Sequence, residues 1–158
     1  MESKKELPLR LGVGIVLLNN KNQILVGKRI DNPRNSWQMP QGGVHKDEKF
    51  LIAAKRELEE ETGVKTVKLV KELDEWFIYD LPSNLLGKIW KGKYRGQRQK
   101  WFIMKFTGKN IEINVNTENP EFSDWKWINI EDLTKVAVTF KINVYKKIEE
   151  KLNSLGIN

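Results

Sequence analysis

Hydrophobic residues occur along the chain in short runs, and their spacing indicates strands before it indicates a helix. Two β-rich runs, Leu9–Leu18 and Gln23–Ile30, are separated by Asn and Lys residues of the kind found in hairpin turns. We therefore expect two antiparallel strands near the start of the chain. Later runs alternate hydrophobic and polar residues and predict further strands at Thr66–Pro82, Arg98–Gly108 and Asp124–Ile130.

Two other segments have a helical period. Leu51, Ala54 and Leu58 recur at the spacing of one helix face. Asp47 is placed to cap the start of this helix and Gly63 to end it, which gives a length of about four turns. From Thr139 onward, a second amphipathic helix that ends near Gly156 is predicted by apolar residues at every fourth position: Phe140, Val144, Ile148 and Leu152.

Strands therefore precede, separate and follow two helices. This order implies an α/β fold in which a mixed β-sheet is sandwiched between α-helices. A chain of 158 residues has the size of one ordinary domain, and the sequence has neither a second hydrophobic unit nor a flexible divider. We expect a single domain at residues 9–158, preceded by a flexible tail at residues 1–8.

Composition narrows the classes of protein that this chain can be. The longest apolar run, VGIVLL, is far shorter than the roughly 20 residues that cross a bilayer, and no apolar signal region follows the N-terminal charges. We therefore expect a cytoplasmic protein with no membrane partner. The net charge of +7 favours polyanionic partners such as nucleotides or RNA.

The chain contains no cysteine and one histidine, His45. Disulfides, thiolate metal sites and a cysteine nucleophile are therefore excluded, and one histidine cannot make a zinc site by itself. Any metal ion must be held mainly by oxygen ligands. His45 is expected on the surface.

The first helix carries an unusual density of acidic residues beside its apolar face. Glu57, Glu60 and Glu61 fall within an arc of roughly 100° when the helix turns by about 100° per residue. Two carboxylates about 6 Å apart repel by about 3 kcal/mol at an effective dielectric constant of 20. One interpretation is an acidic helix face that is exposed to solvent. If the carboxylates are instead partly enclosed, they would need a cation to offset their repulsion.

The residues around these glutamates form a longer pattern. Gly42 is followed after five residues by Glu48, and then after seven residues by the segment RELEEETGV, Arg56 to Val64. This stretch resembles the signature of the Nudix hydrolase family and matches it at every defined position. The resemblance implies hydrolysis of a phosphoanhydride with the help of Mg²⁺, Mn²⁺ or another divalent cation, because such ions neutralise phosphate oxygens and acidify the attacking water.

The resemblance also implies roles for individual residues. Glu57, Glu60 and Glu61 would be metal ligands, and the general base would be one of them or a later glutamate. Arg56 lies one turn before Glu60 and is expected to orient its carboxylate. The paired glycines Gly42 and Gly43 would let the backbone turn tightly and approach the substrate closely, while Glu48 would favour the start of the helix through its dipole.

Stretches outside the signature are similar to one subgroup, the RNA pyrophosphohydrolases and diadenosine polyphosphate hydrolases. These stretches are WQMPQGG, GQRQKWF, PEFSDWKW and VTFKINVY. Carried over by position, Glu121 would be a further metal ligand or base. Phe140 and Lys141 would stack on a base and contact phosphate, although Phe140 could equally anchor its own helix in the core. Arg10 and Lys28 would contact phosphates, and the adjacent Arg29 leaves open which of the two basic residues reaches the ligand.

The segment Lys88–Trp101 interleaves basic residues with Trp90, Tyr94 and Trp101. This arrangement is expected where a nucleic-acid chain lies over a site, but a solvated basic loop is an equal alternative.

Together these features predict a Mg²⁺-dependent enzyme that removes pyrophosphate from 5′-triphosphorylated RNA and cleaves dinucleoside polyphosphates such as diadenosine tetraphosphate. The alternatives are a hydrolase that sanitises mononucleotides and a catalytically silent module that binds nucleotide or RNA.

Overall fold

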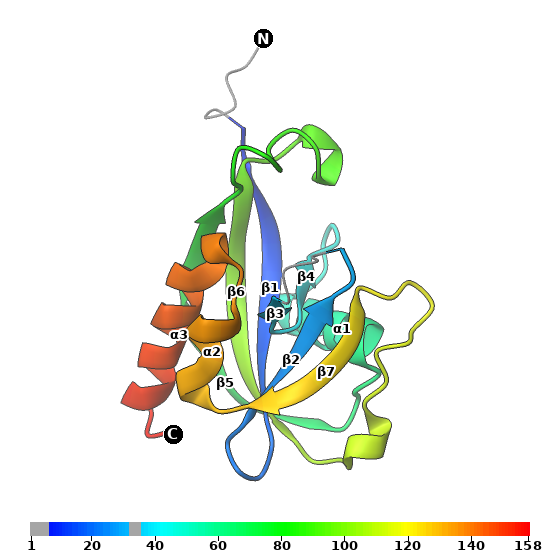
Figure 1. Ribbon diagram of the computed structural model, residues 1–158, viewed down its shortest axis with the longest axis vertical. Helices are drawn as coiled ribbons and strands as arrows, with labels where there is room; N and C mark the ends of the chain where they lie inside the picture. The colour runs from blue at the N-terminus through cyan, green and yellow to red at the C-terminus, as the bar shows by residue number, and fades with distance from the viewer. Residues whose placement is uncertain (1–6, 32–35) are drawn as a thin grey trace.

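The computed structural model describes residues 7–31 and 36–158 of the chain (Figure 1). Of the predicted tail at residues 1–8, residues 1–6 lie outside this description. The helices and strands are β1 (Leu9–Leu18), β2 (Ile24–Arg29), β3 (Trp37–Gln38), β4 (Gln41–Gly43), α1 (Phe50–Thr62), β5 (Val67–Asp80), β6 (Gly96–Phe106), β7 (Phe122–Ile128), α2 (Leu133–Val136) and α3 (Ile142–Ser154).

The sheet is mixed, as predicted. β1 runs parallel to β6 and antiparallel to β4, and β6 pairs with β5 in the antiparallel sense. β2 pairs with β3 and β7, both antiparallel. The predicted β1–β2 hairpin exists at its turn, where Leu18 lies opposite Ile24. Beyond that point the two strands diverge to different partners, and this divergence places β1 and β2 on two sides of the molecule's main cavity.

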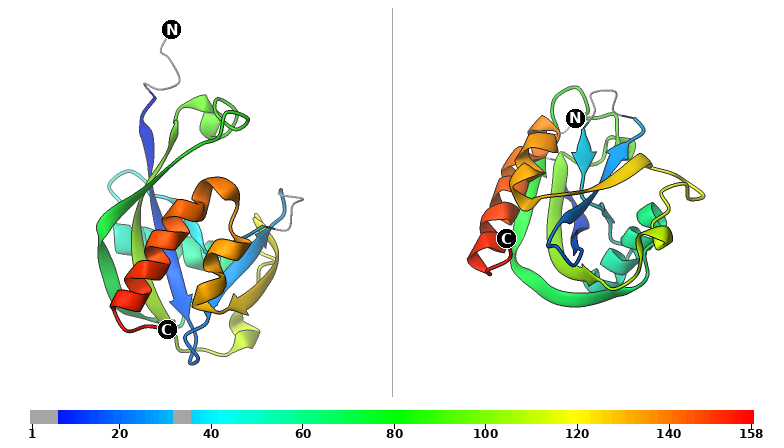
Figure 2. Two further views of the ribbon diagram at one scale, coloured as in Figure 1. Left: turned by 60° about the vertical axis from the view of Figure 1, so that its left-hand side comes forward. Right: turned by 60° about the horizontal axis from the view of Figure 1, so that its bottom comes forward.

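Helices cover both faces of the central strands, with α1 on one side and α2 and α3 on the other (Figures 1 and 2). The alternation of side chains along β1 explains this arrangement. Val13 and Ile15 pack in one cluster with Leu58 of α1, whereas Val16 packs in a second cluster with Ile148 of α3. All five side chains are fully buried. The predicted layered α/β fold is therefore confirmed.

Sequence signals predicted most ends of the helices and strands correctly. Each predicted strand agrees with the structure to within two residues at either end. Gly63 ends α1 in a left-handed conformation, φ 74°, and donates its N–H to the Glu59 carbonyl at 2.8 Å. None of the helices in residues 7–31 and 36–158 is long and apolar enough to cross a membrane.

Two details of the predicted helices are wrong. Asp47 does not cap α1: Lys49 occupies the cap position, and Asp47 has a left-handed φ of 63° in the preceding turn. This turn is closed by Glu48, whose N–H donates to the His45 carbonyl at 3.0 Å and whose carboxylate accepts the His45 N–H at 2.9 Å. Phe140 lies in the short turn Thr139–Lys141, just before α3 begins.

Candidate active site

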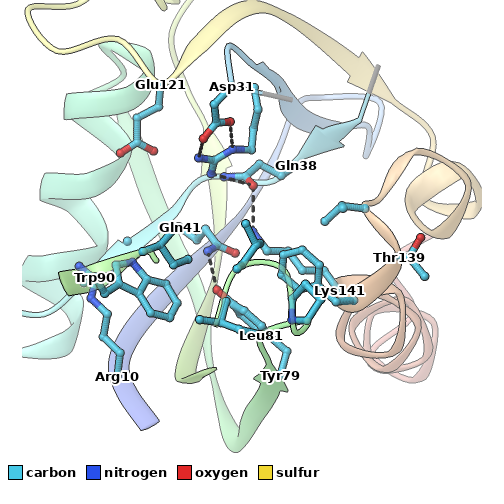
Figure 3. A pocket seen from close by; sticks show the side chains of 18 of the residues that line it. Arg10, Asp31, Gln38, Gln41, Tyr79, Leu81, Trp90, Glu121, Thr139 and Lys141 are labelled. Carbon is cyan, nitrogen blue, oxygen red and sulfur yellow. Dashed lines mark hydrogen bonds and ion pairs between the residues drawn. The ribbon is translucent and has the colours of Figure 1, made fainter. Parts of the chain in front are cut away.

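A cavity of about 840 Å³ brings together segments that are far apart in the sequence (Figure 3). Its wall contains residues from β1, β4, α1 and β5, the connection between β5 and β6, and the turn before α3. The predicted site residues in the wall are Arg10, Gly42, Gly43, Glu57, Glu121, Phe140 and Lys141. Residues in the wall that sequence reasoning did not assign a role are Asp31, Gln38, Gln41, Tyr79 and the apolar residues of the β5–β6 connection.

The paired glycines of β4 allow two functional side chains to approach the backbone. A Cβ on Gly42 would lie 2.0 Å from Cδ of Glu57, and a Cβ on Gly43 would lie 2.3 Å from Nη2 of Arg10. Both distances are too short for any real contact. Glycine at these two positions therefore makes room for one acidic and one basic side chain, which is a more specific role than a tight turn.

Arg56 connects the loop before α1 to the acidic face of the helix. Its Nε and Nη2 donate to the two carboxylate oxygens of Glu48 at 2.8 and 2.9 Å, and Nη2 also donates to the Gly43 carbonyl at 2.8 Å. Nη1 donates to Glu57 at 2.9 Å and to Glu60 at 3.2 Å. Arg56 thus holds Glu57 as well as the predicted partner Glu60, and its bidentate partner is Glu48.

This pairing also accounts for Glu48, which was predicted to act through the helix dipole. The hydrogen bonds from Arg56, followed by that from the His45 N–H, lower the pKa of Glu48 to about 2. Glu48 and Glu57 in turn raise the pKa of Arg56. The contact is enclosed, since the side chains of Arg56 and Glu48 are 21% and 12% exposed. Glu48 therefore anchors the arginine that positions Glu57.

Glu61 is the most deeply buried carboxylate of the site. The residue is 3% exposed, and its Oε2 accepts the Gln41 N–H at 3.3 Å. Oε1 has no hydrogen-bond partner within the described part of the chain. Burial, followed by the nearby charges of Glu121 and Glu57, raises the pKa of Glu61 well above its ordinary value. Burial also raises the pKa of Glu57.

The carboxylates of Glu57, Glu61 and Glu121 fit a divalent cation. A bound cation would relieve their mutual repulsion and provide a partner for Oε1 of Glu61. Glu60 has a different environment: its side chain is 57% exposed and its pairing with Arg56 lies outside the cavity wall. Across residues 7–31 and 36–158, no group of three or more acidic or histidine side chains has the arrangement of a preformed metal site. The predicted ligand set is therefore not gathered around one point in this structure.

Basic residues also line the cavity. Arg29 belongs to the wall, whereas Lys28 is not among the described residues that line it. Arg29 forms a bidentate pair with Asp31, with both distances at 2.7 Å. Of the two adjacent basic residues, Arg29 is thus the one that the fold directs into the cavity.

Lys141 is buried, and its Nζ donates to Oε1 of Gln38 at 2.9 Å (Figure 3). Burial, followed by the charge of Arg29, lowers the pKa of Lys141 to about 7. A positive charge at this point is costly unless an anion is near, so the position suits contact with phosphate.

Aromatic side chains form two separate parts of the wall. The rings of Tyr79 and Phe140 are 5.6 Å apart, and Phe140 also packs against the core cluster that contains α3. Phe140 therefore anchors its turn in the core, and its stacking on a base stays a prediction. Trp90 lies beside Arg10, with the guanidinium carbon 5.1 Å from the ring centre. Trp101, which was grouped with Trp90 as a nucleic-acid contact, is fully buried in the core and cannot stack on RNA.

Polar side chains beneath the cavity form a buried network that the sequence did not reveal. The hydroxyl of Tyr79 donates to Oε1 of Gln97 at 3.1 Å, and Nε2 of Gln41 lies 3.3 Å from that hydroxyl. Gln41 opens the short strand QGG and Gln97 lies in the polar first half of β6, so neither position indicates burial. Their contact depends on the pairing of β1 with both β4 and β6.

Comparisons of the sequence with known proteins find a matching family model and similar relatives. The family model described as the NUDIX domain matches residues 8–148. The chain is 59% identical to the RNA pyrophosphohydrolase of Pelagibacter ubique (strain HTCC1062), over 98% of this chain and 98% of that relative. It is 46% identical to the RNA pyrophosphohydrolase of Rickettsia prowazekii (strain Madrid E), over 95% of this chain and 93% of that relative.

Solved structures are similar at lower sequence identity. The Escherichia coli dihydroneopterin triphosphate pyrophosphohydrolase has a TM-score of 0.70 and 18% identity, covering 91% of this chain and 99% of that one. An Ap4A hydrolase from C. elegans has a TM-score of 0.67 and 21% identity, covering 92% and 99%. At such identities these two structures show the shared fold alone.

Proposed function

The chain belongs to the Nudix hydrolase family, and from this premise we propose that it is an RNA pyrophosphohydrolase that removes pyrophosphate from the 5′-triphosphate end of RNA. Cleavage of dinucleoside polyphosphates such as diadenosine tetraphosphate belongs to the same proposal, since both substrates join a nucleoside to a polyphosphate. Action on RNA in the cytoplasm follows from this substrate.

The observation that carries the proposal is the opposition of charge within one cavity. Glu57 and Glu121 lie in its wall and Glu61 is buried next to them, while Arg10, Arg29 and Lys141 lie elsewhere in the wall. A polyphosphate needs both kinds of group. The basic residues bind its oxygens directly, and the acidic residues bind cations that the phosphate can share.

Glu57, Glu61 and Glu121 are the residues that would hold Mg²⁺ or Mn²⁺, with Glu60 at the exposed edge. When bound, the cation supplies neutralisation of the phosphate oxygens and a more acidic water. Arg56 keeps the Glu57 carboxylate in place, and the missing Cβ of Gly42 gives that carboxylate its position. Phe140, which packs on the buried ring of Tyr79, offers an aromatic surface for a base.

A comparison of three substrates tests the proposal. Wild-type protein with Mg²⁺ should hydrolyse triphosphorylated RNA and diadenosine tetraphosphate more efficiently than nucleoside triphosphates. Changing Glu57 or Glu61 to Gln should reduce turnover by at least about 100-fold, because removal of one preorganised charge typically costs this much. Glu59→Gln is the matched control: it lies on the same helix, but its side chain is 50% exposed and pairs with Lys65.

Other outcomes point to the alternatives. A preference for nucleoside triphosphates would indicate a mononucleotide-sanitising enzyme. Binding of RNA without release of pyrophosphate by the folded wild type would indicate a catalytically silent module.

A further inference from the structure

The connection between β5 and β6 carries a backbone conformation that calls for an explanation. Trp90 and Lys91 have positive φ values of 51° and 58°, and Gly92 follows with 70°. Bulky side chains rarely adopt this left-handed region, because Cβ approaches the carbonyl oxygen. Such outliers persist where the surrounding structure imposes them, and they are concentrated at functional sites.

The surrounding contacts fix this turn firmly. The N–H of Gly92 donates to the Ile89 carbonyl at 3.0 Å, and that of Lys93 donates to the Trp90 carbonyl at 3.2 Å. Gly92 is closely packed on Gly87, since an added Cβ would lie 3.0 Å from the Gly87 carbonyl oxygen. The ring of Tyr94 contacts the Trp90 ring edge-on at 6.3 Å. These contacts therefore hold Trp90 in one place despite its unfavourable backbone conformation.

That place is the cavity wall. Trp90 lies beside Arg10, and both lie away from Lys141 (Figure 3). Both positions combine aromatic and cationic side chains: Arg10 lies 5.1 Å from the Trp90 ring, and Lys141 lies 5.4 and 5.6 Å from the rings of Tyr79 and Phe140. One cavity thus contains two separate aromatic surfaces, each next to a positive charge.

A mononucleotide has one base and can use one such surface. We propose that Trp90 is a specificity-determining residue that stacks on a second nucleobase, so that the cavity selects substrates with two bases joined through phosphate. The inference rests on the proposed function and extends it to a particular side chain. Phe140, which packs on the buried Tyr79 ring, receives one base, Trp90 with Arg10 receives the other, and the phosphates lie between them beside the carboxylates.

The test compares two-base and one-base substrates in the full-length protein. The ratio of kcat/KM for diadenosine tetraphosphate to kcat/KM for ATP should fall by about 5- to 100-fold in Trp90→Leu, which keeps apolar bulk but removes the ring. The change should arise mainly in KM. Trp90→Phe should restore most of the ratio, because phenylalanine again offers a flat face. The same pattern should hold for a triphosphorylated dinucleotide against ATP.

Trp76→Leu is a matched control. Trp76 also pairs with an arginine, since Arg98 lies 3.9 Å from its ring, but it lines a different depression beside α3. Its loss should leave the ratio within twofold of wild type.

An unchanged ratio in an active, folded Trp90→Leu protein, or equal losses in Trp90→Leu and Trp90→Phe, would overturn the role of Trp90 alone. A folded wild type that cleaves neither two-base substrate would overturn the proposed function and this inference together.

Discussion

The replacement of Gly42 by alanine tests the position of the Glu57 carboxylate without removing the carboxylate. Gly42 lies in β4, where the extended backbone accepts any residue, so the added methyl acts through space alone. That methyl would lie 2.0 Å from Cδ of Glu57 and 2.1 Å from one of its oxygens. Ordinary contacts begin at about 3.4 Å, so the carboxylate must move by at least 1.4 Å.

A displacement of about 1 Å in a reacting group can reduce the rate by about 100-fold. We therefore expect Gly42→Ala to reduce kcat for pyrophosphate release from triphosphorylated RNA by about 100-fold, although every acidic residue is still present. The melting temperature should change little, because Glu57 is partly exposed and can turn outward.

Gly43→Ala is the paired variant. Its methyl would meet the end of the flexible Arg10 side chain at 2.3 Å. The expected effect is a raised KM, with a smaller effect on kcat, because in the proposed site Arg10 would contact the substrate and not the cation. A folded Gly42→Ala enzyme with kcat near the wild-type value would show that catalysis does not require the Glu57 carboxylate at its position against Gly42.

Three further predictions follow from the titrating groups. The ionised Glu48 stabilises the fold above about pH 4.5, and this stabilisation is lost as the pH falls to about 2, because the pKa of Glu48 is lowered in the folded protein. Glu48→Gln should therefore make the free energy of unfolding fall less steeply with decreasing pH in this range. Urea unfolding at several pH values measures the slope, and an unchanged slope would contradict the prediction. Lys141→Met should stabilise the protein below pH 7, by at most about 5 kcal/mol, because burial lowers the pKa of Lys141 from 10.5 to about 7 and the charged amine therefore costs stability in the folded state. This advantage should shrink as pH rises to about 10.5, and a gain that is constant with pH would argue against it. The affinity for Mn²⁺ should rise with pH in wild type and depend less on pH in Glu61→Gln, because the cation must displace the proton that the raised pKa of Glu61 retains; calorimetric titration at two pH values would show either result.

Local patterns in the sequence located the longer elements of the fold, β1, β2, β5, β6, β7, α1 and α3, whereas the short elements β3, β4 and α2 were not predicted. Period-two and helical spacing located the strands and helices, because half-buried elements require those periods, and Gly63 ended α1 as a left-handed cap must. Asp47 was misassigned because a cap residue is defined by the hydrogen bonds it makes. In the structure Glu48 accepts the His45 N–H and closes the turn, and Asp47 lies within that turn.

The candidate site was harder to predict, since it depends on long-range pairing. The parallel pairing of β1 with β6 and the antiparallel pairing of β1 with β4 bring Gln97 and Gln41 together, and nothing local to either residue indicates this. The choice of Arg29 over Lys28 likewise depends on which face of β2 meets the cavity. Trp90 and Trp101 look alike in the sequence, yet one lines the cavity and the other fills the core.

The central claim is that Glu57, Glu61 and Glu121 collect divalent cations that make a phosphoanhydride cleavable. Anomalous diffraction from crystals soaked in Mn²⁺ with a non-hydrolysable triphosphate analogue tests it most directly. We expect manganese peaks between these three carboxylates, in contact with the analogue's phosphates. Peaks at other acidic residues, with the analogue bound and the space between Glu57, Glu61 and Glu121 free of metal, would contradict it.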